Sequence, residues 1–572
     1  MCKINLSRDR ENIDKIWCWF VMTCKRRTSN LFVICLLMAG LLTISDCLSL
    51  DEVSRAITLD SIIVDELKRY LIQASDLQQN RTNAKFQYIN RYIEEHHDIF
   101  SHVQQSSERA EKTAADAVAS LMLVRRLAVD WPRILRMNLN NTDSTHATES
   151  DSRWIGIKSS VIEAEKNLSL LVEEQDVLMH SDSFARLIEM YKLKLGEQQS
   201  TSSSLNLQVK DAMLIGSAAL TDKYYGTAAD VFYTAQQFAE NSTNESDHPS
   251  TFRKRSLLVQ QLKHLVHLAT SLHDRRLSME GYTQQNGMFS SPFSKVSLKA
   301  QKEEEEPIPS ISAFKKIRRL TSMTEKEDVI LFGHICRGKT FLSEAEKSKL
   351  TCRFDTRGSS YYILMPALVE QHSLDPELVT FHRVVTKRQI QEITSLGIPF
   401  LQQAAFRSGN IKEDSVGSFK IRSSYTAWLQ EDTHPVLKNL NKKISALTGL
   451  HLNDNKGYSE ALQLNVYGAG GYYSPHVDAF NLGDEAYNNT DDVKDPGEIA
   501  ERREGDRIAT VMFYMNDVEA GGYTAFPRIG VGVKPTEGSA VFWTNLLSDG
   551  STDVRTLHGA CPVLKGIKWG MY

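Results

Sequence analysis

A chain of 572 residues is too long for one hydrophobic core, so we expect two to four domains. Hydrophobic residues make up 41% of the chain and charged residues 24%, which is typical of an ordinary globular protein. The formal net charge of -4 gives no electrostatic reason to expect a nucleic acid as partner.

An apolar run at residues 31–44 follows a short basic cluster near the N-terminus. The run is shorter than the roughly 20 residues of a membrane-spanning helix, and Cys47 and Ser49 are small enough for signal-peptidase cleavage. We therefore predict a signal segment over residues 1–49, with Met1 or Met22 as the start and with no membrane span after its removal. A signal anchor is the alternative.

Six sequons that suit a lumenal glycoprotein begin at Asn80, Asn140, Asn167, Asn241, Asn244 and Asn488.

Apolar residues recur at helical spacing from residue 50 to about residue 131, where Gly and Pro are rare. The two clearest stripes are Ile63, Leu67, Tyr70, Leu71 and Ala74, and Val118, Leu121, Val124 and Ala128. We predict a helical or coiled-coil association domain over residues 50–180. The plainer alternative is that both stripes form an ordinary core.

A sharper helical pattern lies at residues 215–235. The small and aromatic positions of a tetratricopeptide (TPR) helix pair are matched in spacing by Gly216, Ala228, Phe232 and Ala235. We predict a TPR-like domain over residues 181–282. Tyr224 and Tyr225 lie between its two helices and could stack on an extended proline-rich peptide, or could be half-buried packing at a helix end.

Residues 283–329 are predicted to be a linker, because they contain the acidic run 303–306 followed by Pro307 and Pro309. Beyond the linker, short runs alternate apolar with polar residues and are rich in aromatic and β-branched side chains. These runs, LQLNVY, RIATVMFYM, SAVFWTN and GIKWGMY, predict the strands of a sandwich or barrel in a domain over residues 330–572.

His476 and Asp478 lie two positions apart on one predicted strand, where residues i and i+2 share a face, so both can bind one ion. His96 and Asp98 have the same spacing in a helical segment, where they point to nearly opposite sides. With His558 as a third ligand, the pair would form a two-histidine, one-carboxylate triad that leaves positions free on Fe(II). A salt-bridged surface pair is the alternative.

Lys568 lies on the last predicted strand. A lysine that points into a barrel is unfavourable unless an anion meets it, and that anion could be the distal carboxylate of 2-oxoglutarate. The alternative is that Lys568 faces solvent.

Four blocks in this order and spacing resemble the α subunit of collagen prolyl 4-hydroxylase: LQLNVYGAGGYYSPHVDAF, RIATVMFYMNDVEAGGYTAFP, GSAVFWTNL and LHGACPVLKGIKW. Weaker similarity extends upstream through FHRVV, IRSSYTAWL and LQVKDAMLIGSAAL. The resemblance implies a multidomain α+β protein with an all-α N-terminal half and a C-terminal double-stranded β-helix (jelly-roll) catalytic domain.

The resemblance also implies residue roles. The matching positions are the Fe(II) ligands His476, Asp478 and His558, the 2-oxoglutarate-binding Lys568, the peptide-binding Tyr224 and Tyr225, and the disulfide pair Cys336 and Cys352. The family works in the endoplasmic reticulum lumen as an α2β2 tetramer with protein disulfide isomerase as β subunit. Its cofactors and co-substrates are Fe(II), 2-oxoglutarate, O2 and L-ascorbate (vitamin C).

The implied enzyme is a procollagen-proline 4-dioxygenase. It would hydroxylate proline to 4-hydroxyproline in collagen-like X-Pro-Gly peptides and oxidatively decarboxylate 2-oxoglutarate to succinate. The alternatives are an impaired relative that only binds peptide or isomerase, and a dioxygenase with a non-collagen substrate. Two departures from the family stand out: Leu220 replaces a tyrosine of the peptide-binding domain, and the chain stops at Tyr572, so that Cys561 would lack its family partner.

Overall fold

The computed structural model describes residues 50–75, 87, 89–90, 92–93, 113–134, 174–195, 207–241, 249–279, 325–404, 422–454, 457–479 and 505–572. The predicted signal segment, every sequon except that at Asn241, most of the predicted linker and the His96–Asp98 pair lie outside these residues. Within the described residues, no helix is both long enough and apolar enough to cross a membrane.

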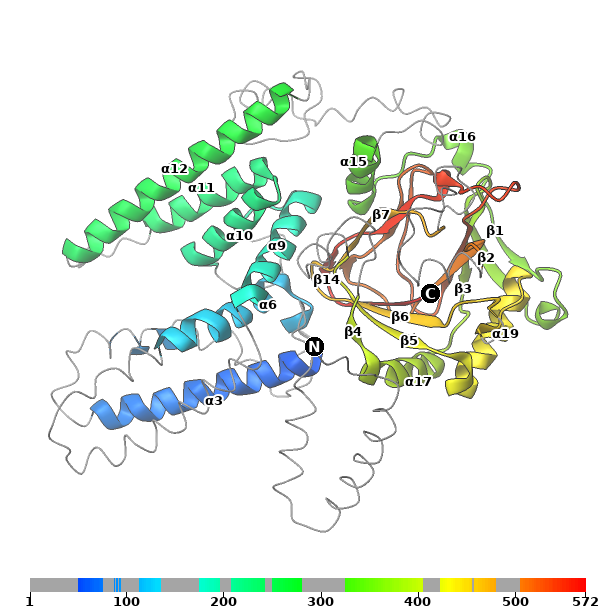
Figure 1. The fold of residues 1–572 in the computed structure, drawn as a ribbon, viewed down its shortest axis with the longest axis horizontal. Helices are drawn as coiled ribbons and strands as arrows, with labels where there is room; N and C mark the ends of the chain where they lie inside the picture. Colours follow the sequence, from blue (N-terminus) through cyan, green and yellow to red (C-terminus); the bar gives the residue numbers. More distant parts are fainter. Residues whose placement is uncertain are drawn as a thin grey trace, which may run out of the picture. The chain divides into compact units, whose positions relative to one another are not determined.

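The N-terminal half is helical, as predicted (Figure 1). Its elements are α3 (Leu50–Ser75), α6 (Ala117–Arg125), the π-helical turn η2 (Arg126–Asp130), α9 (Glu174–Tyr191), α10 (Val209–Thr221), α11 (Tyr225–Asn241) and α12 (Pro249–Met279). Ile63 and Leu67 of the first predicted stripe and Leu121 and Val124 of the second are buried in one hydrophobic core. These parts of the stripes are therefore core.

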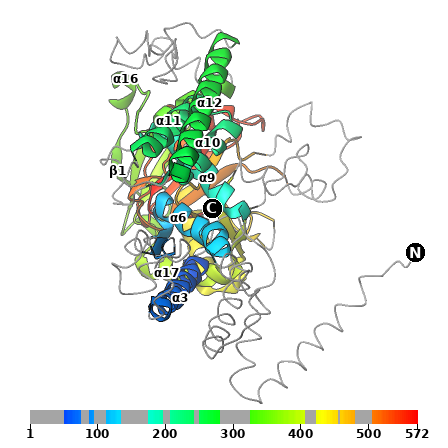
Figure 2. The same ribbon diagram turned by 90° about the vertical axis from the view of Figure 1, so that its left-hand side faces the viewer.

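The predicted helix pair at residues 215–235 is formed by α10 and α11, and α11 lies beside α12 in both views (Figure 1, Figure 2). A side chain on Gly216 would place its Cβ 2.6 Å from Cε1 of Phe232, so the close approach of the two helices requires glycine. Tyr224 lies in the turn between the helices, is half-buried against the helical core and has its pKa raised to about 12 by burial.

The C-terminal region is built from sheets, as predicted. The larger sheet has nine strands in the order β1-β2-β3-β12-β8-β15-β6-β5-β4, and a four-stranded sheet has the order β11-β10-β13-β7. Strands of the larger sheet are β1 (Cys352–Asp355), β2 (Ala367–Ser373), β3 (Leu378–His382), β4 (Gln402–Gln403), β5 (Tyr425–Leu429), β6 (Leu462–Tyr467), β8 (Ala509–Tyr514), β12 (Ala540–Thr544) and β15 (Lys568–Met571). Those of the smaller sheet are β7 (Tyr473–His476), β10 (Thr524–Phe526), β11 (Val531–Val533) and β13 (His558–Ala560), and a separate pair is β9 (Ala520–Gly521) with β14 (Val563–Lys565).

Alternation along β8 explains how the two sheets pack. Met512 and Tyr514 belong to a core cluster that includes Phe526 of the smaller sheet. Phe513, between them, belongs instead to the cluster shared with helices α17 (Lys387–Gly397) and α19 (Pro435–Thr448). One face of the large sheet therefore packs on helices and the other on the small sheet, which is consistent with a jelly-roll.

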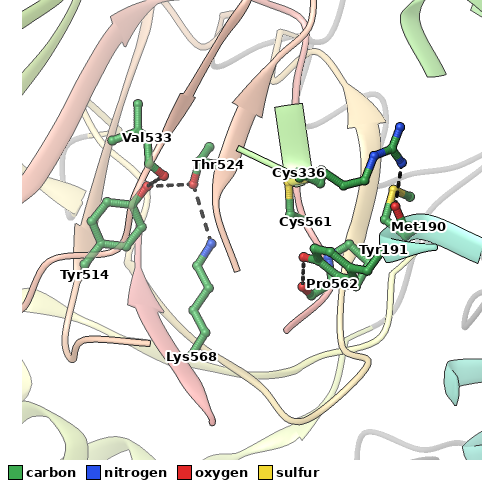
Figure 3. The surroundings of a disulfide bond; sticks show 10 residues. Met190, Tyr191, Cys336, Tyr514, Thr524, Val533, Cys561, Pro562 and Lys568 are labelled. Atoms are coloured by element: carbon green, nitrogen blue, oxygen red, sulfur yellow. Dashed lines mark hydrogen bonds between the residues drawn. A yellow bond between two sulfur atoms is a disulfide. The ribbon is translucent and has the colours of Figure 1, made fainter. Parts of the chain in front are cut away.

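The disulfide prediction is wrong. Cys336, at the end of α15 (Glu325–Cys336), is bonded to Cys561 (Figure 3). Cys352 on β1 is free and exposed. The reason is packing: α15 lies against the small sheet, where Phe332 and Cys561 share one apolar cluster, whereas β1 pairs only with β2 in the large sheet. Nearby, the Tyr191 hydroxyl donates a 2.5 Å hydrogen bond to the carbonyl of Pro562.

Peptide mapping tests this assignment. When the native protein is alkylated without reduction and then digested, we expect Cys352 to be alkylated and Cys336 and Cys561 to appear in one disulfide-linked peptide. Alkylation after reduction, in which all three thiols react, is the control. A linked Cys336–Cys352 peptide would contradict the pairing.

Candidate metal centre

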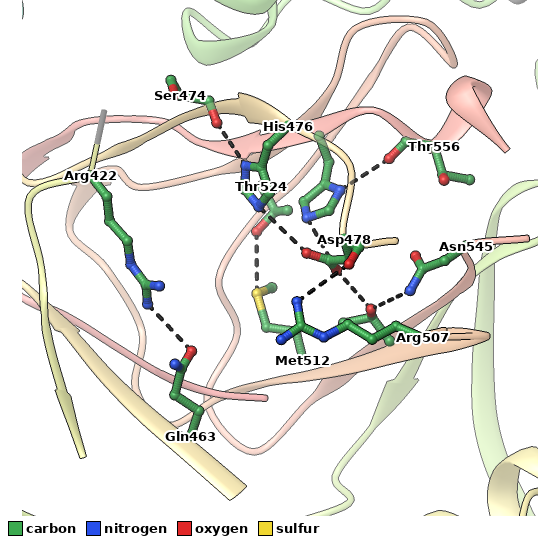
Figure 4. Close-up of polar contacts among 12 residues, drawn as sticks. Arg422, Gln463, Ser474, His476, Asp478, Arg507, Met512, Thr524, Asn545 and Thr556 are labelled. Atoms are coloured by element: carbon green, nitrogen blue, oxygen red, sulfur yellow. Dashed lines mark hydrogen bonds and ion pairs between the residues drawn. The ribbon is translucent and has the colours of Figure 1, made fainter. Parts of the chain in front are cut away.

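The three predicted metal ligands converge in the structure (Figure 4). Strands β7 and β13 pair antiparallel with His476 opposite His558, and one candidate ligand atom from each of His476, Asp478 and His558 lies within 4.8 Å of the others. Strand β7 ends at His476, and Asp478 lies in the bend that follows. The prediction that both residues lie on one strand is therefore wrong for Asp478. The bend still turns the carboxylate toward both imidazoles.

Each imidazole has a defined tautomer. Nδ1 of His476 lies 2.7 Å from the carbonyl oxygen of Ser474, and Nδ1 of His558 lies 3.0 Å from that of Thr556. Because a carbonyl only accepts, both Nδ1 atoms carry the hydrogen, so Nε2 is the nitrogen of each ring that can bind a ligand. Nε2 of His558 is buried and has no hydrogen-bond partner among the described residues, which is the state expected of a metal ligand in a structure without its ion.

Aromatic rings hold the two imidazoles in place. The Tyr473 ring stacks on His476 with ring centroids 3.7 Å apart. Trp543 of β12, in the larger sheet, meets His558 edge-on at 4.6 Å. Phe526 of β10, the strand that pairs with β13, lies 5.5 Å from the same ring. The imidazoles are therefore oriented before any ligand arrives.

The Asp478 carboxylate lies between the two imidazoles, 3.5 Å from Nε2 of His476 through Oδ1 and 3.6 Å from Nε2 of His558 through Oδ2. Burial raises its pKa, but the charges and hydrogen bonds of His558, His476 and Thr510 outweigh burial and hold the pKa well below its usual range. Burial lowers the pKa of His558 to about 4, against the opposing effect of Asp478. At neutral pH an ionised carboxylate and a neutral imidazole thus face a common point, as a divalent cation requires.

Lys568, on β15, is only 1% exposed, so the alternative that it faces solvent does not hold. Its Nζ lies 3.5 Å from the hydroxyl oxygen of Thr524 and sits over the rings of Tyr467 and Tyr514 at 5.7 Å and 5.4 Å. Burial lowers its pKa to about 7. Within the described chain its ammonium forms no ion pair with a carboxylate, so this buried position suits an anionic ligand.

Several residues around the site were not predicted. The Arg422 guanidinium contacts Gln463 at 3.4 Å (Figure 4). It also bonds to Asn465 and lies over the Tyr473 ring at 4.8 Å. Asn465 is fully buried within the apolar run of β6, and a polar side chain at a buried strand position is the signal that points to it. Tyr224 and Tyr225 are not part of this centre and belong to the helical half.

Replacing Lys568 with Met tests the burial of its charge. Because burial lowers the pKa from 10.5 to about 7, the unfolded chain binds more protons between these pH values, and wild-type stability rises with pH through this window. We expect Lys568→Met to raise the free energy of unfolding of the ligand-free protein at pH 7 by on the order of a few kcal/mol, with the gain disappearing near pH 10.5.

Urea denaturation at pH 7 and pH 10 measures this difference. Lys565→Met is the matched control, because Lys565 lies at the surface and pairs with the exposed Glu519, so its loss should change stability little. A Lys568→Met protein no more stable than wild type at pH 7 would contradict the burial of an unpaired ammonium.

Two family models match separate parts of the chain. Residues 462–572 match the 2OG-Fe(II) oxygenase superfamily, and residues 49–199 match the N-terminal region of the prolyl 4-hydroxylase alpha-subunit. A solved structure of a viral collagen prolyl hydroxylase from Paramecium bursaria Chlorella virus-1, in its 2OG complex, is 22% identical, covers 34% of this chain and 92% of its own, and has a TM-score of 0.25. That TM-score is too low to establish a shared fold.

Curated relatives extend the similarity over most of the chain. Prolyl 4-hydroxylase subunit alpha-2 of Gallus gallus is 28% identical over 541 residues, which are 91% of this chain and 91% of the relative. Prolyl 4-hydroxylase subunit alpha-1 of Homo sapiens is 38% identical over 237 residues, or 41% of each chain. The two matched family regions and the long alignment agree: the chain is similar to prolyl 4-hydroxylase alpha subunits over most of its length, and residues 462–572 match the 2OG-Fe(II) oxygenase superfamily.

Proposed function

We propose that the chain is a proline 4-hydroxylase that uses Fe(II) and 2-oxoglutarate and acts on collagen-like X-Pro-Gly peptides. The observation that carries the proposal is the convergence of His476, Asp478 and His558 in a domain that also buries Lys568, with no carboxylate partner for it among the described residues. The relatives named prolyl 4-hydroxylase alpha subunits support the reaction class.

The donor set suits Fe(II). Two imidazole nitrogens and one carboxylate oxygen make a facial triad that leaves coordination positions free for other ligands. When Fe(II), 2-oxoglutarate and O2 are bound, they supply the oxidation that hydroxylates a proline ring carbon and converts 2-oxoglutarate to succinate and CO2. The residues of this chain orient the ligands: the backbone carbonyls fix the imidazole tautomers, and the stacked Tyr473 and edge-on Trp543 fix the ring planes.

Lys568 would hold the distal carboxylate of 2-oxoglutarate through a charge-assisted hydrogen bond. An anion beside its buried ammonium raises the pKa of the lysine back toward its usual range and removes the unfavourable burial. The Thr524 hydroxyl accepts a 2.8 Å hydrogen bond from Tyr514 and donates a 3.8 Å hydrogen bond to Sδ of Met512. It would exchange this weak sulfur acceptor for the same carboxylate. Lysine and threonine would together select a ligand with a second acidic group.

Peptide binding would involve the helical half. Tyr224 and Tyr225, at the turn of the α10–α11 pair, would stack on proline rings of an extended substrate, in a TPR-like domain over residues 181–282. An association domain with coiled-coil character over residues 50–180, a linker over 283–329 and the oxygenase domain over 330–572 complete the proposed organisation. The boundary at residue 180 falls within α9, so the first two domains would share this helix.

The cellular setting is also part of the proposal. The apolar leader and the sequons of the sequence support a signal segment, glycosylation and a place in the endoplasmic reticulum lumen. Similarity to alpha subunits over most of the chain supports an α2β2 assembly with protein disulfide isomerase as β subunit and L-ascorbate as reductant.

Replacing Asp478 with Ala tests the metal site. We expect Asp478→Ala to abolish both 2-oxoglutarate decarboxylation and formation of 4-hydroxyproline in a (Pro-Pro-Gly) peptide, because two imidazoles alone hold Fe(II) poorly. The chain is co-expressed with protein disulfide isomerase, and both products are measured, the second by mass spectrometry. Asp549→Ala, which removes an exposed carboxylate, is the matched control and should keep wild-type activity.

Three results separate the candidate functions. Full activity of Asp478→Ala would overturn the metal site. Decarboxylation by the wild type without 4-hydroxyproline in the peptide would indicate a different substrate. Absence of decarboxylation by the wild type with added Fe(II) would indicate a chain that only binds peptide or isomerase.

Tyr225→Ala tests peptide binding. We expect it to raise the KM for the (Pro-Pro-Gly) peptide about tenfold and to leave the KM for 2-oxoglutarate unchanged, because a lost stacking contact removes on the order of 1 kcal/mol of binding energy. Tyr225→Phe keeps the ring face and should behave as wild type, and Tyr361→Ala, at an exposed tyrosine of the oxygenase domain, is the control. An unchanged peptide KM in Tyr225→Ala would favour simple helix-end packing.

A further inference from the structure

Two polar side chains that lie outside the metal triad form a hydrogen-bond relay to it. We infer that Thr510 and Asn545 are positioning residues that hold the Asp478 carboxylate with Oδ2 bound by a hydroxyl and Oδ1 left to the metal ion. The inference rests on the proposed function, because it concerns how tightly the triad holds its ion.

The relay joins three segments of the chain, and its two ends, Asp478 and Asn545, are labelled in Figure 4. The hydroxyl of Thr510, on β8, donates a 2.7 Å hydrogen bond to Oδ2 of Asp478, in the bend after β7. The amide Nδ2 of Asn545, directly after β12, donates a 2.9 Å hydrogen bond to the same Thr510 oxygen. The carboxylate is thus tied to the large sheet, although its own backbone follows a strand of the small sheet.

The direction of each hydrogen bond follows from the ionised carboxylate. A carboxylate only accepts, so the single hydrogen of Thr510 must point to Asp478. The Thr510 oxygen can then only accept from its other neighbour, which requires Asn545 to present its NH2 group and not its carbonyl. Consistent with this orientation, Oδ1 of Asn545 is buried and has no hydrogen-bond partner among the described residues. An unsatisfied buried amide oxygen is unfavourable, and the direction of the relay explains why it is tolerated.

The sheet makes the relay rigid. Asn545 is 2% exposed, its N–H donates to the carbonyl of Ile508 at 2.9 Å, and its carbonyl accepts from the N–H of Asp553 at 2.8 Å. Thr510 is paired with Trp543, two residues before Asn545, in the antiparallel register of β8 and β12. Neither relay residue can shift without moving paired strands, so the position of the Asp478 carboxylate is set by the large sheet.

The hydrogen bond from Thr510 to Oδ2 of Asp478 determines which carboxylate oxygen can bind the metal ion. Oδ2 of Asp478 accepts from Thr510, whereas Oδ1, 3.5 Å from Nε2 of His476, has no hydroxyl or amide donor among its described contacts. A carboxylate held in this way offers one oxygen to the ion and leaves the other coordination positions to co-substrates. Without the relay the carboxylate can rotate about its Cβ–Cγ bond, and the triad loses affinity for its ion.

Affinity for Mn(II), used as a stable probe for the Fe(II) site, tests the relay without any turnover. Free Mn(II) is measured by electron paramagnetic resonance in titrations of the purified full chain, co-expressed with its isomerase partner. We expect Thr510→Val, which keeps the shape but removes the hydroxyl, to weaken binding about 10- to 100-fold. Thr510→Ser restores the donor and should bind within about threefold of wild type.

Asn545→Asp tests the direction of the relay. The new carboxylate cannot donate to Thr510, and it competes with Asp478 for the single hydroxyl hydrogen. We therefore expect Asn545→Asp to weaken Mn(II) binding by a similar factor. If Thr510 instead donated its hydrogen to residue 545, the change would leave Mn(II) binding unaltered.

Thr380→Val is the matched control. Thr380 is 2% exposed on β3 of the same sheet, and the change removes a 2.7 Å hydrogen bond to His372 without touching the triad. It should keep wild-type Mn(II) affinity.

The outcomes separate the relay from the proposed function. Wild-type Mn(II) affinity in Thr510→Val overturns the relay, and equal losses in Thr510→Val and Thr380→Val show a general loss of packing and overturn it as well. A wild-type chain that retains no Mn(II) overturns the proposed metal site itself. If Thr510→Val does not fold, judged by near-ultraviolet circular dichroism, the Mn(II) affinities of Asn545→Asp and Thr510→Ser are compared instead. Equal affinities in these two variants would overturn the relay.

Discussion

The antiparallel register of β7 and β13 is the constraint on which the metal centre depends. It places His476 opposite His558, and a slip of one residue would turn one imidazole to the other face of the sheet. The glycine that follows His558 helps to fix this register, because a Cβ on Gly559 would lie 2.8 Å from the carbonyl oxygen of Tyr473 and 2.8 Å from the Phe332 ring. The Cys336–Cys561 disulfide ties the end of the same strand to α15. Close backbone approach and a covalent bond thus act on the strand that carries His558, the third candidate ligand.

The centre contains groups that are unfavourable in the ligand-free protein. Lys568 is buried without a carboxylate partner, and Nε2 of His558 is buried without a hydrogen bond in the described part of the chain. Each is relieved only when an anion or a cation binds beside it, so ligand binding also stabilises the fold. Proteins commonly accept reduced stability at such sites in exchange for an oriented, dry cavity. Here Tyr514, Phe526 and Trp543 form part of one buried apolar cluster beside these groups.

The sequence predicts those features that depend on local geometry. The alternating runs are found as strands β6, β8, β12 and β15, and the helix pair around Gly216 is found as α10 and α11. Features that depend on long-range packing were missed: Cys336 pairs with Cys561 because α15 packs on the small sheet, a contact that residue spacing does not reveal. Thr510 and Asn545 were not predicted, because a threonine on a strand and an asparagine just after one are common. Only the register of β8 with β12 brings the two residues together.

A neutral relay suits Asp478 better than a charged partner would. An arginine bonded to the carboxylate would neutralise the negative charge that attracts a divalent cation and would compete with it for the oxygens. The nearby Arg507 contacts the backbone carbonyl of Asp478 at 3.3 Å and forms an ion pair with Glu460 at 2.9 Å. The carboxylate oxygen itself receives the uncharged Thr510 hydroxyl. The structure therefore fixes the direction of the ligand with a hydroxyl and an amide, while its charge remains available to the metal ion.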